Sequence, residues 1–203
     1  MIDESLLKKY HASLLKVKKG EMLFEEGETA TNFYLVKSGR IKMVNVSSEG
    51  REFVQGYFGA GQSFGEPPFF ARVAYPASAY ATEASAIWKI GYDQFVLLLR
   101  NNFEIHLHLL KVLSDRLIYK STMLSEIAIE EAEHRLSTLI EYLTGQSASN
   151  PDAPATLSFT RQQLADMTGL RVETVIRSIK SMEQRRLLEL TPDGKIILKR
   201  KPK

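Results

Sequence analysis

Hydrophobic and polar positions alternate over short runs in the first half of the chain. Apolar and β-branched runs such as NFYLVKSG, RIKMVNV and REFVQGYF are separated by glycines at short intervals. Such alternation is typical of strands that bury one face, and the glycines favour turns between them. The pattern from about Ser13 to Ile90 therefore predicts a β-barrel or β-roll, preceded by a short helix over about Glu4 to Tyr10. Within it, Ser47–Gly50 is expected to form a hairpin turn.

The apolar spacing becomes helical between Tyr92 and Glu133, a stretch with no Gly or Pro in its interior. Large aliphatic residues recur there at alternating spacings of three and four, interrupted by Lys120: Leu110, Leu113, Leu117, Leu124 and Ile127. A narrow apolar stripe of this kind is typical of a coiled-coil seam. We therefore predict a single long helix that pairs with its copy in a homodimer. Packing of the same stripe against the β-roll is the alternative.

The last third of the chain predicts a winged helix-turn-helix. A helix over about Glu133 to Leu143 is followed by the polar loop GQSASNPDAPAT and by TRQQLADMTGLRVETVIRSIK. The latter reads as two short helices around Gly169, where a residue without Cβ takes positive φ at little cost. The segment LLELTPDGKIIL then predicts a hairpin that turns at Pro192-Asp193-Gly194. Apolar residues recur at helical spacing on the second short helix: Val172, Val175, Ile176 and Ile179.

The polar residues of this second helix are too many to be buried together. Glu173 and Arg177 are four residues apart, so they lie on one face of the helix. In a major groove, an arginine forks onto guanine and a carboxylate accepts from a cytosine amine. We predict that Arg177, Glu173 and either Arg171 or Val172 face base edges; an ordinary surface ion pair is the alternative for Glu173 and Arg177. Further DNA contacts, chiefly to phosphates or the groove edge, are expected from Thr160, Arg161, Gln162, Thr174 and Lys180.

The charge distribution agrees with a DNA-binding C-terminal region. The net charge is only +3, but residues 135–203 contain 12 Lys and Arg against 7 Asp and Glu. The tail KRKPK supplies part of this excess. A basic surface is what binding to a phosphate backbone requires.

Composition excludes several other classes of protein. The chain has no cysteine, which excludes disulfides, thiolate metal sites and cysteine-held iron–sulfur clusters. No apolar run is long enough to span a bilayer, and the N-terminus lacks a signal-peptide core, so we expect a cytoplasmic protein with no membrane partner. His106 and His108 fall on different helix faces and make a poor metal clip. No catalytic triad order, phosphate loop or HExxH motif occurs, so an enzyme is not expected.

The order and size of these parts, β-roll, long helix and winged helix, resemble the Crp/Fnr family of bacterial transcription regulators, an α+β fold. The resemblance covers essentially the whole chain and is carried by GQSFGE at Gly61–Glu66, TRQQLADMTGL at Thr160–Leu170 and VETVIR at Val172–Arg177. It implies an effector-sensing roll in residues 1–91, a dimerisation helix and hinge in residues 92–133, and a DNA-binding domain in residues 134–203. It also implies double-stranded DNA and RNA polymerase as partners, with a small-molecule effector of unknown identity.

The effector site departs from the cyclic-nucleotide-binding members that it resembles. Gly65-Glu66 match their motif, but Pro76 falls where those members place an arginine that pairs with the cyclic phosphate. Proline has neither charge nor backbone donor, so cyclic AMP is not the expected effector. The residues that the resemblance assigns to the pocket are Gly65, Glu66, Arg72, Ala77, Ser78, Lys120 and Ser121.

Several readings of the pocket stay open. Arg72 replaces the missing arginine only if the loop rearranges. Without cyclic AMP as the effector, Glu66 is a structural remnant of the motif. Lys120 is either an effector contact or a register-setting polar residue at the dimer seam. Side chains such as Phe69, Phe70 and Tyr80 are candidates to fill the cavity, and haem is an effector that we do not favour. A ligand-binding module that acts on protein partners is the alternative from a different functional class.

Overall fold

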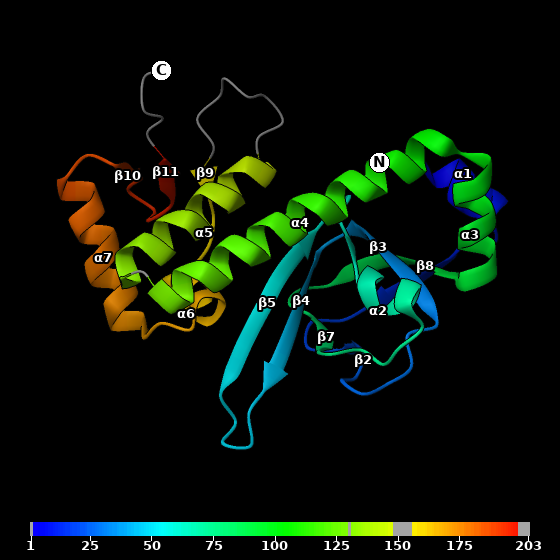
Figure 1. Cartoon of the computed structure of the whole chain (residues 1–203), viewed down its shortest axis with the longest axis horizontal. Coiled ribbons are helices and arrows are strands. Elements are labelled where there is room, and N and C mark those ends of the chain that lie inside the picture. Colours follow the sequence, from blue (N-terminus) through cyan, green and yellow to red (C-terminus); the bar gives the residue numbers. More distant parts are fainter. Residues whose placement is uncertain (1, 130, 148–155, 199–203) are drawn as a thin grey trace. The chain divides into compact units, whose positions relative to one another are not determined.

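The computed structural model describes residues 2–129, 131–147 and 156–198 (Figure 1). The chain divides into two compact units, Met1–Leu113 and Ser114–Lys203. Most of the polar loop GQSASNPDAPAT and the basic tail KRKPK lie outside the described residues. Among the described residues, no helix combines the length and the apolar character that a membrane crossing needs.

The first unit contains two four-stranded antiparallel sheets, as the alternating pattern predicts. One sheet has the order β1 (Ser13–Val17), β8 (Ser85–Gly91), β3 (Asn32–Ser38), β6 (Ser63–Phe64). The other has the order β2 (Met22–Phe24), β7 (Ser78–Ala81), β4 (Arg40–Val46), β5 (Glu52–Gly59). Helix α1 (Glu4–Lys9) precedes the sheets, and α2 (Glu66–Ala71) connects β6 to β7. The predicted hairpin turn at Ser47–Gly50 is confirmed, since β4 pairs with β5 around it.

Aromatic rings fill the space between the sheets and attach a helix to them. Phe24 stacks on Tyr75 with ring centroids 3.6 Å apart. Phe33 of β3 stacks on Phe95 of α3 (Tyr92–Asn101) at 3.8 Å. Burying a side chain of this size stabilises a fold by about 1.5–3 kcal/mol. The second stack therefore fixes α3 on the first sheet.

The prediction of a single long helix starting at Tyr92 is wrong in its first part, because the helix breaks at Asn102. Helix α3 ends at Asn101, and α4 (Phe103–Ile129) begins one residue after the break. The Asn102 backbone leaves the helical region, and its side-chain Nδ2 donates to the Leu98 carbonyl at 2.8 Å. Asparagine competes with helical hydrogen bonding in this way. The long helix is therefore α4, with 27 residues.

The second unit is a winged helix-turn-helix, which confirms the prediction. After α4 come α5 (Ala132–Ser147), β9 (Thr156–Leu157), α6 (Arg161–Thr168), α7 (Val172–Gln184), β10 (Leu188–Leu190) and β11 (Ile196–Leu198). The three strands form one antiparallel sheet in the order β10-β11-β9. Its core joins side chains of every element: Leu136, Leu139, Ile140, Leu157, Leu164, Val175, Ile179, Met182, Leu188 and Ile196.

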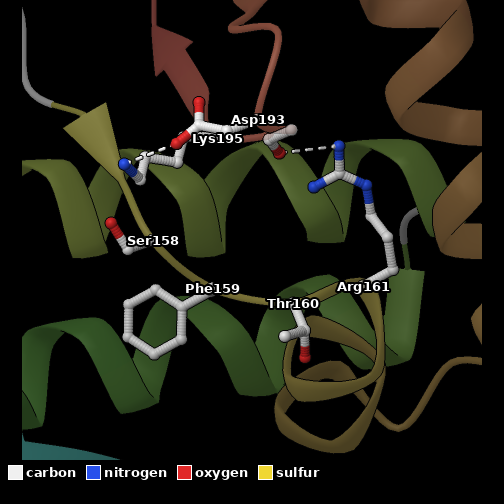
Figure 2. A pocket seen from close by; sticks show the side chains of 7 residues that line it. Ser158, Phe159, Thr160, Arg161, Asp193 and Lys195 are labelled. Atoms are coloured by element: carbon white, nitrogen blue, oxygen red, sulfur yellow. Dashed lines mark hydrogen bonds and ion pairs between the residues drawn. The ribbon is translucent and has the colours of Figure 1, made fainter.

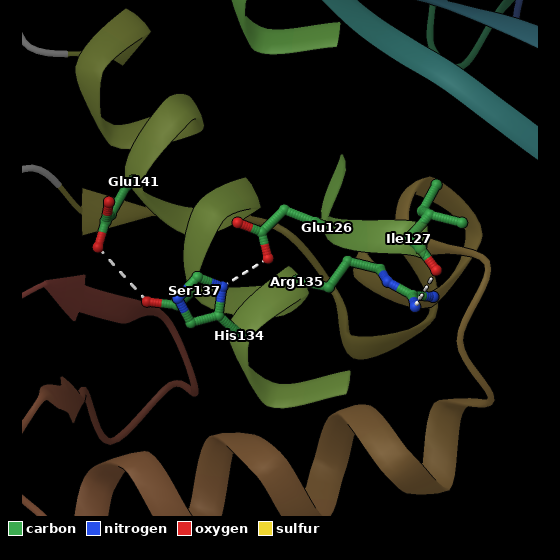
Figure 3. A network of polar contacts seen from close by, with 6 residues as sticks. All are labelled: Glu126, Ile127, His134, Arg135, Ser137 and Glu141. Carbon is green, nitrogen blue, oxygen red and sulfur yellow. Dashed lines mark hydrogen bonds and ion pairs between the residues drawn. The ribbon is translucent and has the colours of Figure 1, made fainter. Parts of the chain in front are cut away.

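Polar contacts connect the end of α4 to α5 (Figure 3), and an aromatic stack adds to them. The buried Glu126 carboxylate lies 2.5 Å from His134 Nδ1, and Arg135 donates to the Ile127 carbonyl at 3.4 Å. Nearer the middle of α4, Tyr119 stacks on Tyr142 of α5, with ring centroids 3.5 Å apart. Burial of the Tyr119 phenol, with Tyr142 as a second cause, raises its pKa above the usual value. The C-terminal half of α4 is thus held to α5, the first helix of the winged helix-turn-helix.

Candidate nucleic-acid interface

The two short helices begin and turn where local chemistry requires. The Thr160 hydroxyl accepts from Gln163 N at 3.1 Å, and Gln163 Oε1 accepts from Thr160 N at 2.9 Å. This reciprocal capping box begins α6 at Arg161. Gly169 ends α6 in the left-handed region, with φ at 69°. The chain can therefore turn at once into α7, as the position of the glycine predicts.

Helix α7 presents one apolar face to the core and one charged face to solvent. Its buried residues are Val175, Ser178, Ile179 and Met182. Its exposed residues, with the residue before the helix, include Arg171, Glu173, Ile176, Arg177 and Lys180. Ile176 shares the helical spacing of the apolar residues but is 49% exposed, so it lies outside the buried stripe. It follows Val175 by one residue, and that rotation of about 100° takes it out of the buried stripe.

Glu173 and Arg177 lie on the solvent face, one turn apart, where neither contributes to the core. Arg171 occupies the N-cap position in an extended conformation, and no side chain caps α7. Val172 and Thr174 are half-buried at the start of the helix. The exposed start of α7 therefore offers another molecule one carboxylate, from Glu173, and two guanidinium groups, from Arg171 and Arg177. It also offers the aliphatic Ile176 side chain and uncapped backbone amides.

Three residues predicted to contact the DNA backbone make hydrogen bonds within the protein. Thr160 caps α6, as described, and Gln162 Nε2 donates to Asp166 Oδ1 at 2.7 Å. Arg161 Nη2 donates to the Gly194 carbonyl at 3.3 Å (Figure 2). Burial lowers the pKa of Arg161, while the charge of Glu183 acts in the opposite direction.

A pocket of about 430 Å³ lies between the start of α6 and the turn that joins β10 to β11. It is lined by Ser158, Phe159, Thr160, Arg161, Asp193, Gly194 and Lys195. Lys195 Nζ is 2.6 Å from Asp193 Oδ2, and the turn is closed by a Gly194 N–H bond to the Thr191 carbonyl at 2.8 Å. Sequence reasoning treated this turn only as a hairpin. The sequence did offer one signal for Lys195 as a candidate contact. This lysine directly follows Gly194 and lies in the basic third of the chain.

The predicted effector residues fall into two sets in the two units. Gly65, Glu66, Arg72, Ala77 and Ser78 surround α2 and the start of β7 in the first unit. Glu66 is 1% exposed, and its carboxylate accepts a hydrogen bond from the Ser63 hydroxyl. The Arg72 guanidinium carbon lies 4.2 Å from the centroid of the Tyr92 ring, a cation–π contact.

Lys120 and Ser121 belong to the second unit, on the exposed surface of α4. Desolvation of the ammonium, followed by repulsion from Arg116, lowers the pKa of Lys120. The two sets of predicted effector residues are thus carried by separate parts of the fold.

Rings that sequence reasoning did not single out pack against the predicted effector pocket. A Cβ at Gly65 would lie 3.2 Å from Tyr75 and 3.4 Å from Phe24. Tyr34 joins this stack, and burial followed by the Glu28 charge raises its pKa to about 12. The expected filling residue Phe69 is fully buried, but in the neighbouring cluster with Phe33 and Phe95. Phe24 and Tyr75 are far apart in sequence, so no local pattern could identify their stack.

The Pro76 peptide is held by side chains of neighbouring strands. Asn45 Nδ2 donates to the Pro76 carbonyl at 2.6 Å and to Glu26 Oε2 at 3.0 Å. A backbone amide, Glu26 N, donates to Ser78 Oγ at 2.9 Å. A carboxylate therefore lies near the position where a phosphate-binding arginine was expected. Within the described residues, no group of three or more His, Asp or Glu could hold a metal ion.

Two family models match the chain and together cover most of it. The one described as Cyclic nucleotide-binding domain matches residues 14–102, and the one described as Crp-like helix-turn-helix domain matches residues 134–203. They correspond to the β-sheet unit and to the winged helix described above.

The chain is also similar to regulators from several bacteria. It is 30% identical over 181 residues to the cAMP-activated global transcriptional regulator CRP of Haemophilus influenzae, covering 88% of this chain and 80% of the relative. It is 26% identical over 176 residues to the Fumarate and nitrate reduction regulatory protein of Yersinia pestis, covering 86% and 70%. The structure of FixK2 from Bradyrhizobium japonicum matches at a TM-score of 0.75 over 93% of each chain, with 17% identity, and shows the same fold.

Proposed function

Because the chain belongs to the Crp/Fnr family of DNA-binding transcription regulators, which are not enzymes, we propose that it acts as a homodimer on a two-fold symmetric DNA site without depending on cyclic AMP. In this proposal residues 1–91 sense an effector, residues 92–133 supply the dimerisation helix and hinge, and residues 134–203 bind DNA. RNA polymerase is the proposed protein partner, and the cytoplasm, where chromosomal DNA lies, is the proposed compartment.

The observation that carries the proposal is the exposed face of α7. Glu173 and Arg177 lie in solvent one turn apart, on the second helix of a helix-turn-helix. In the major groove Arg177 would donate to guanine, and Glu173 would accept from a cytosine amine. The exposed Ile176 beside them would pack on a thymine methyl group. A ligand-binding module that acts on protein partners has no need of such a face.

The other predicted contacts lie where the DNA backbone would pass, and all but Arg161 are proposed to contact it directly. Thr160, Arg161, Gln162 and Thr174 border the start of α6 and α7, and Lys180 lies on the solvent side of α7. Uncapped amides at the start of α7 would approach a phosphate favourably. The order Val172-Glu173-x-x-x-Arg177 resembles the fumarate/nitrate branch, so half-sites similar to TTG are proposed.

Arg177→Ala separates base reading from charge neutralisation. We expect it to weaken binding to the best site by about 1–3 kcal/mol and to remove discrimination at one base pair, because the bidentate contact to guanine is lost. Lys180→Ala is the matched control, since it removes the same charge from the same helix. It should weaken all sites similarly and reduce the salt slope by roughly one. Fluorescence anisotropy on a panel of single-base variants measures both, and indistinguishable profiles would show that Arg177 does not read a base.

The exposed surface of α4 supports the proposed homodimer. Leu117 and Leu124 are 69% and 70% exposed in the single chain, a large apolar surface for two neighbouring heptads. Leu113, assigned to the same stripe by the sequence, instead packs against the core of the first unit. The exposed large side chains on α4 are Phe103, Leu107, Leu110, Leu117, Ile118, Leu124 and Ile127.

These positions refine the proposed seam. Leu110, Leu117 and Leu124 repeat every seven residues, and Ser114 and Ser121 occupy the intervening exposed positions. Small residues at alternate seam positions let two helices approach closely, so Ser121 lies in the proposed seam and Lys120 beside it. An isologous pairing of α4 also gives two copies of α7 related by a two-fold axis.

Leu117→Glu should convert the protein to a monomer. Removing one leucine from each side of the seam costs about 3 kcal/mol in total, roughly a hundredfold in the dimer Kd, before charge repulsion is counted. Leu97→Glu is the control, because Leu97 is 44% exposed and belongs to α3, outside the proposed seam. Analytical ultracentrifugation gives the mass of each. If Leu117→Glu remains dimeric at micromolar concentration, α4 is not the seam.

Independence from cyclic AMP is supported by what occupies the region of Pro76. The Glu26 carboxylate shares Asn45 with the Pro76 carbonyl, and Glu66 already bonds Ser63. Phe24 and Tyr75 pack directly against Gly65. A cyclic phosphate would meet a carboxylate instead of a bidentate arginine. The proposed effector is therefore an uncharged or differently charged molecule, with Arg72 in the first unit and Lys120 in the second as the candidate cations.

Isothermal titration calorimetry with cyclic AMP and cyclic GMP tests this point. We expect no binding in the micromolar range, because the missing charge-assisted contact to a partly buried phosphate costs several-fold more than one neutral hydrogen bond restores. Micromolar binding coupled to tighter DNA affinity would show that Arg72 or Lys120 has replaced the missing arginine.

A further inference from the structure

The wing turn between β10 and β11 is connected to α6 through the Arg161 side chain. Arg161 is the first residue of α6, and its Nη2 donates to Gly194 O, 33 residues later, at 3.3 Å. Figure 2 shows the guanidinium extended toward the turn, on the far side of the pocket from Ser158 and Phe159. The charge of Glu183, at the end of α7, acts on the same guanidinium. Arg161 is therefore directed toward groups of its own protein.

Lys195 lies on the same turn, and its ammonium group can exchange its carboxylate partner for a phosphate. Its Nζ is 2.6 Å from Asp193 Oδ2, and both side chains are largely exposed. An ion pair in this setting is weak, so a DNA phosphate can displace the carboxylate. The position of Lys195 depends on the turn, and the turn is connected to α6 by Arg161.

We propose that Arg161 is a positioning residue that holds the wing turn against α6, and that the turn in turn places Lys195 on the DNA backbone. The inference rests on the proposed function and deepens it, because it assigns to Arg161 a role other than a phosphate contact of its own. The guanidinium suits this role, since its planar donors can bond a carbonyl in a fixed direction. The hydrogen bond to Gly194 and the shared pocket wall are the observations that carry it.

Hydrogen exchange in the protein without DNA provides the first test. The Gly194 and Lys195 amides bond Thr191, to its carbonyl at 2.8 Å and to its hydroxyl at 2.9 Å, and they report on closure of the turn. Arg161→Met removes the donors and keeps most of the stem. We expect it to increase exchange of these amides roughly three- to tenfold, the scale of one lost hydrogen bond. Lys180→Ala, which removes a charge outside the turn, should leave them unchanged.

Amides of α5 are the internal reference for this measurement. If Arg161→Met raises exchange in α5 as much as in the turn, the whole unit has been destabilised. Arg161→Leu, which also lacks side-chain donors, is then compared in the same way. An unchanged turn in the variant that keeps α5 protected would overturn the proposal. Because no DNA is present, this result does not depend on whether the chain binds DNA as proposed.

The second test is a double-mutant cycle in DNA binding. Each lost phosphate contact reduces the salt slope by about 0.9. Arg161→Met and Lys195→Ala should each reduce the salt slope by about one. The double variant should also reduce it by only about one in total, because Arg161→Met already releases Lys195. A reduction of about two in the double variant would show that Arg161 contacts phosphate independently. Lys180→Ala combined with Lys195→Ala is the control, with an expected reduction of about two.

Discussion

Burial of one stripe of α7 determines which of its side chains can meet another molecule. Val175, Ile179 and Met182 complete the core that α7 shares with α5 and α6. Since the helix turns by about 100° per residue, their burial leaves Glu173 and Arg177 in solvent on the opposite side. The proposed recognition surface is thus a consequence of core packing and not of the charged residues themselves. A substitution in the core stripe would disturb recognition without touching DNA.

Contacts with α6 and α5 fix the position of α7 in the winged helix-turn-helix. The capping box at Thr160 fixes where α6 begins, and the left-handed Gly169 fixes the angle at which α7 leaves it. On the other side, Glu126 and His134 connect α4 with α5, which packs on α7. A change in the proposed dimer helix can therefore reach the DNA-binding face through α5. The Tyr119–Tyr142 stack adds an apolar contact along that route.

The features predicted well from sequence are those set by neighbouring residues. The hairpin at Ser47–Gly50 and the turn at Gly169 depend on residues within a few positions of each other. The break at Asn102 was missed because no Gly or Pro signals it, and its cause is a side-chain bond to Leu98. Periodicity alone does not decide the exposure of Ile176, because it ranks apolar residues together, and only the packed core decides between adjacent positions.

Long-range pairs were beyond sequence reasoning for a different reason. Arg161 meets Gly194, and Phe24 meets Tyr75, only because the chain folds back on itself. The motif resemblance located Gly65-Glu66 and the departure at Pro76, but not the ring stack that packs against them. These rings, together with the Glu26 carboxylate held by Asn45, are the physical reason to look for an effector other than a cyclic nucleotide.

Selection of the full chain on random double-stranded DNA tests the central claim most directly. Two copies of α7 related by a two-fold axis should enrich an inverted repeat, with half-site centres about one helical turn apart. Each half-site should contain a G·C pair for Arg177 beside a thymine. Enrichment of a single asymmetric half-site, or of no motif at all, would contradict a homodimer that reads DNA through the exposed face of α7.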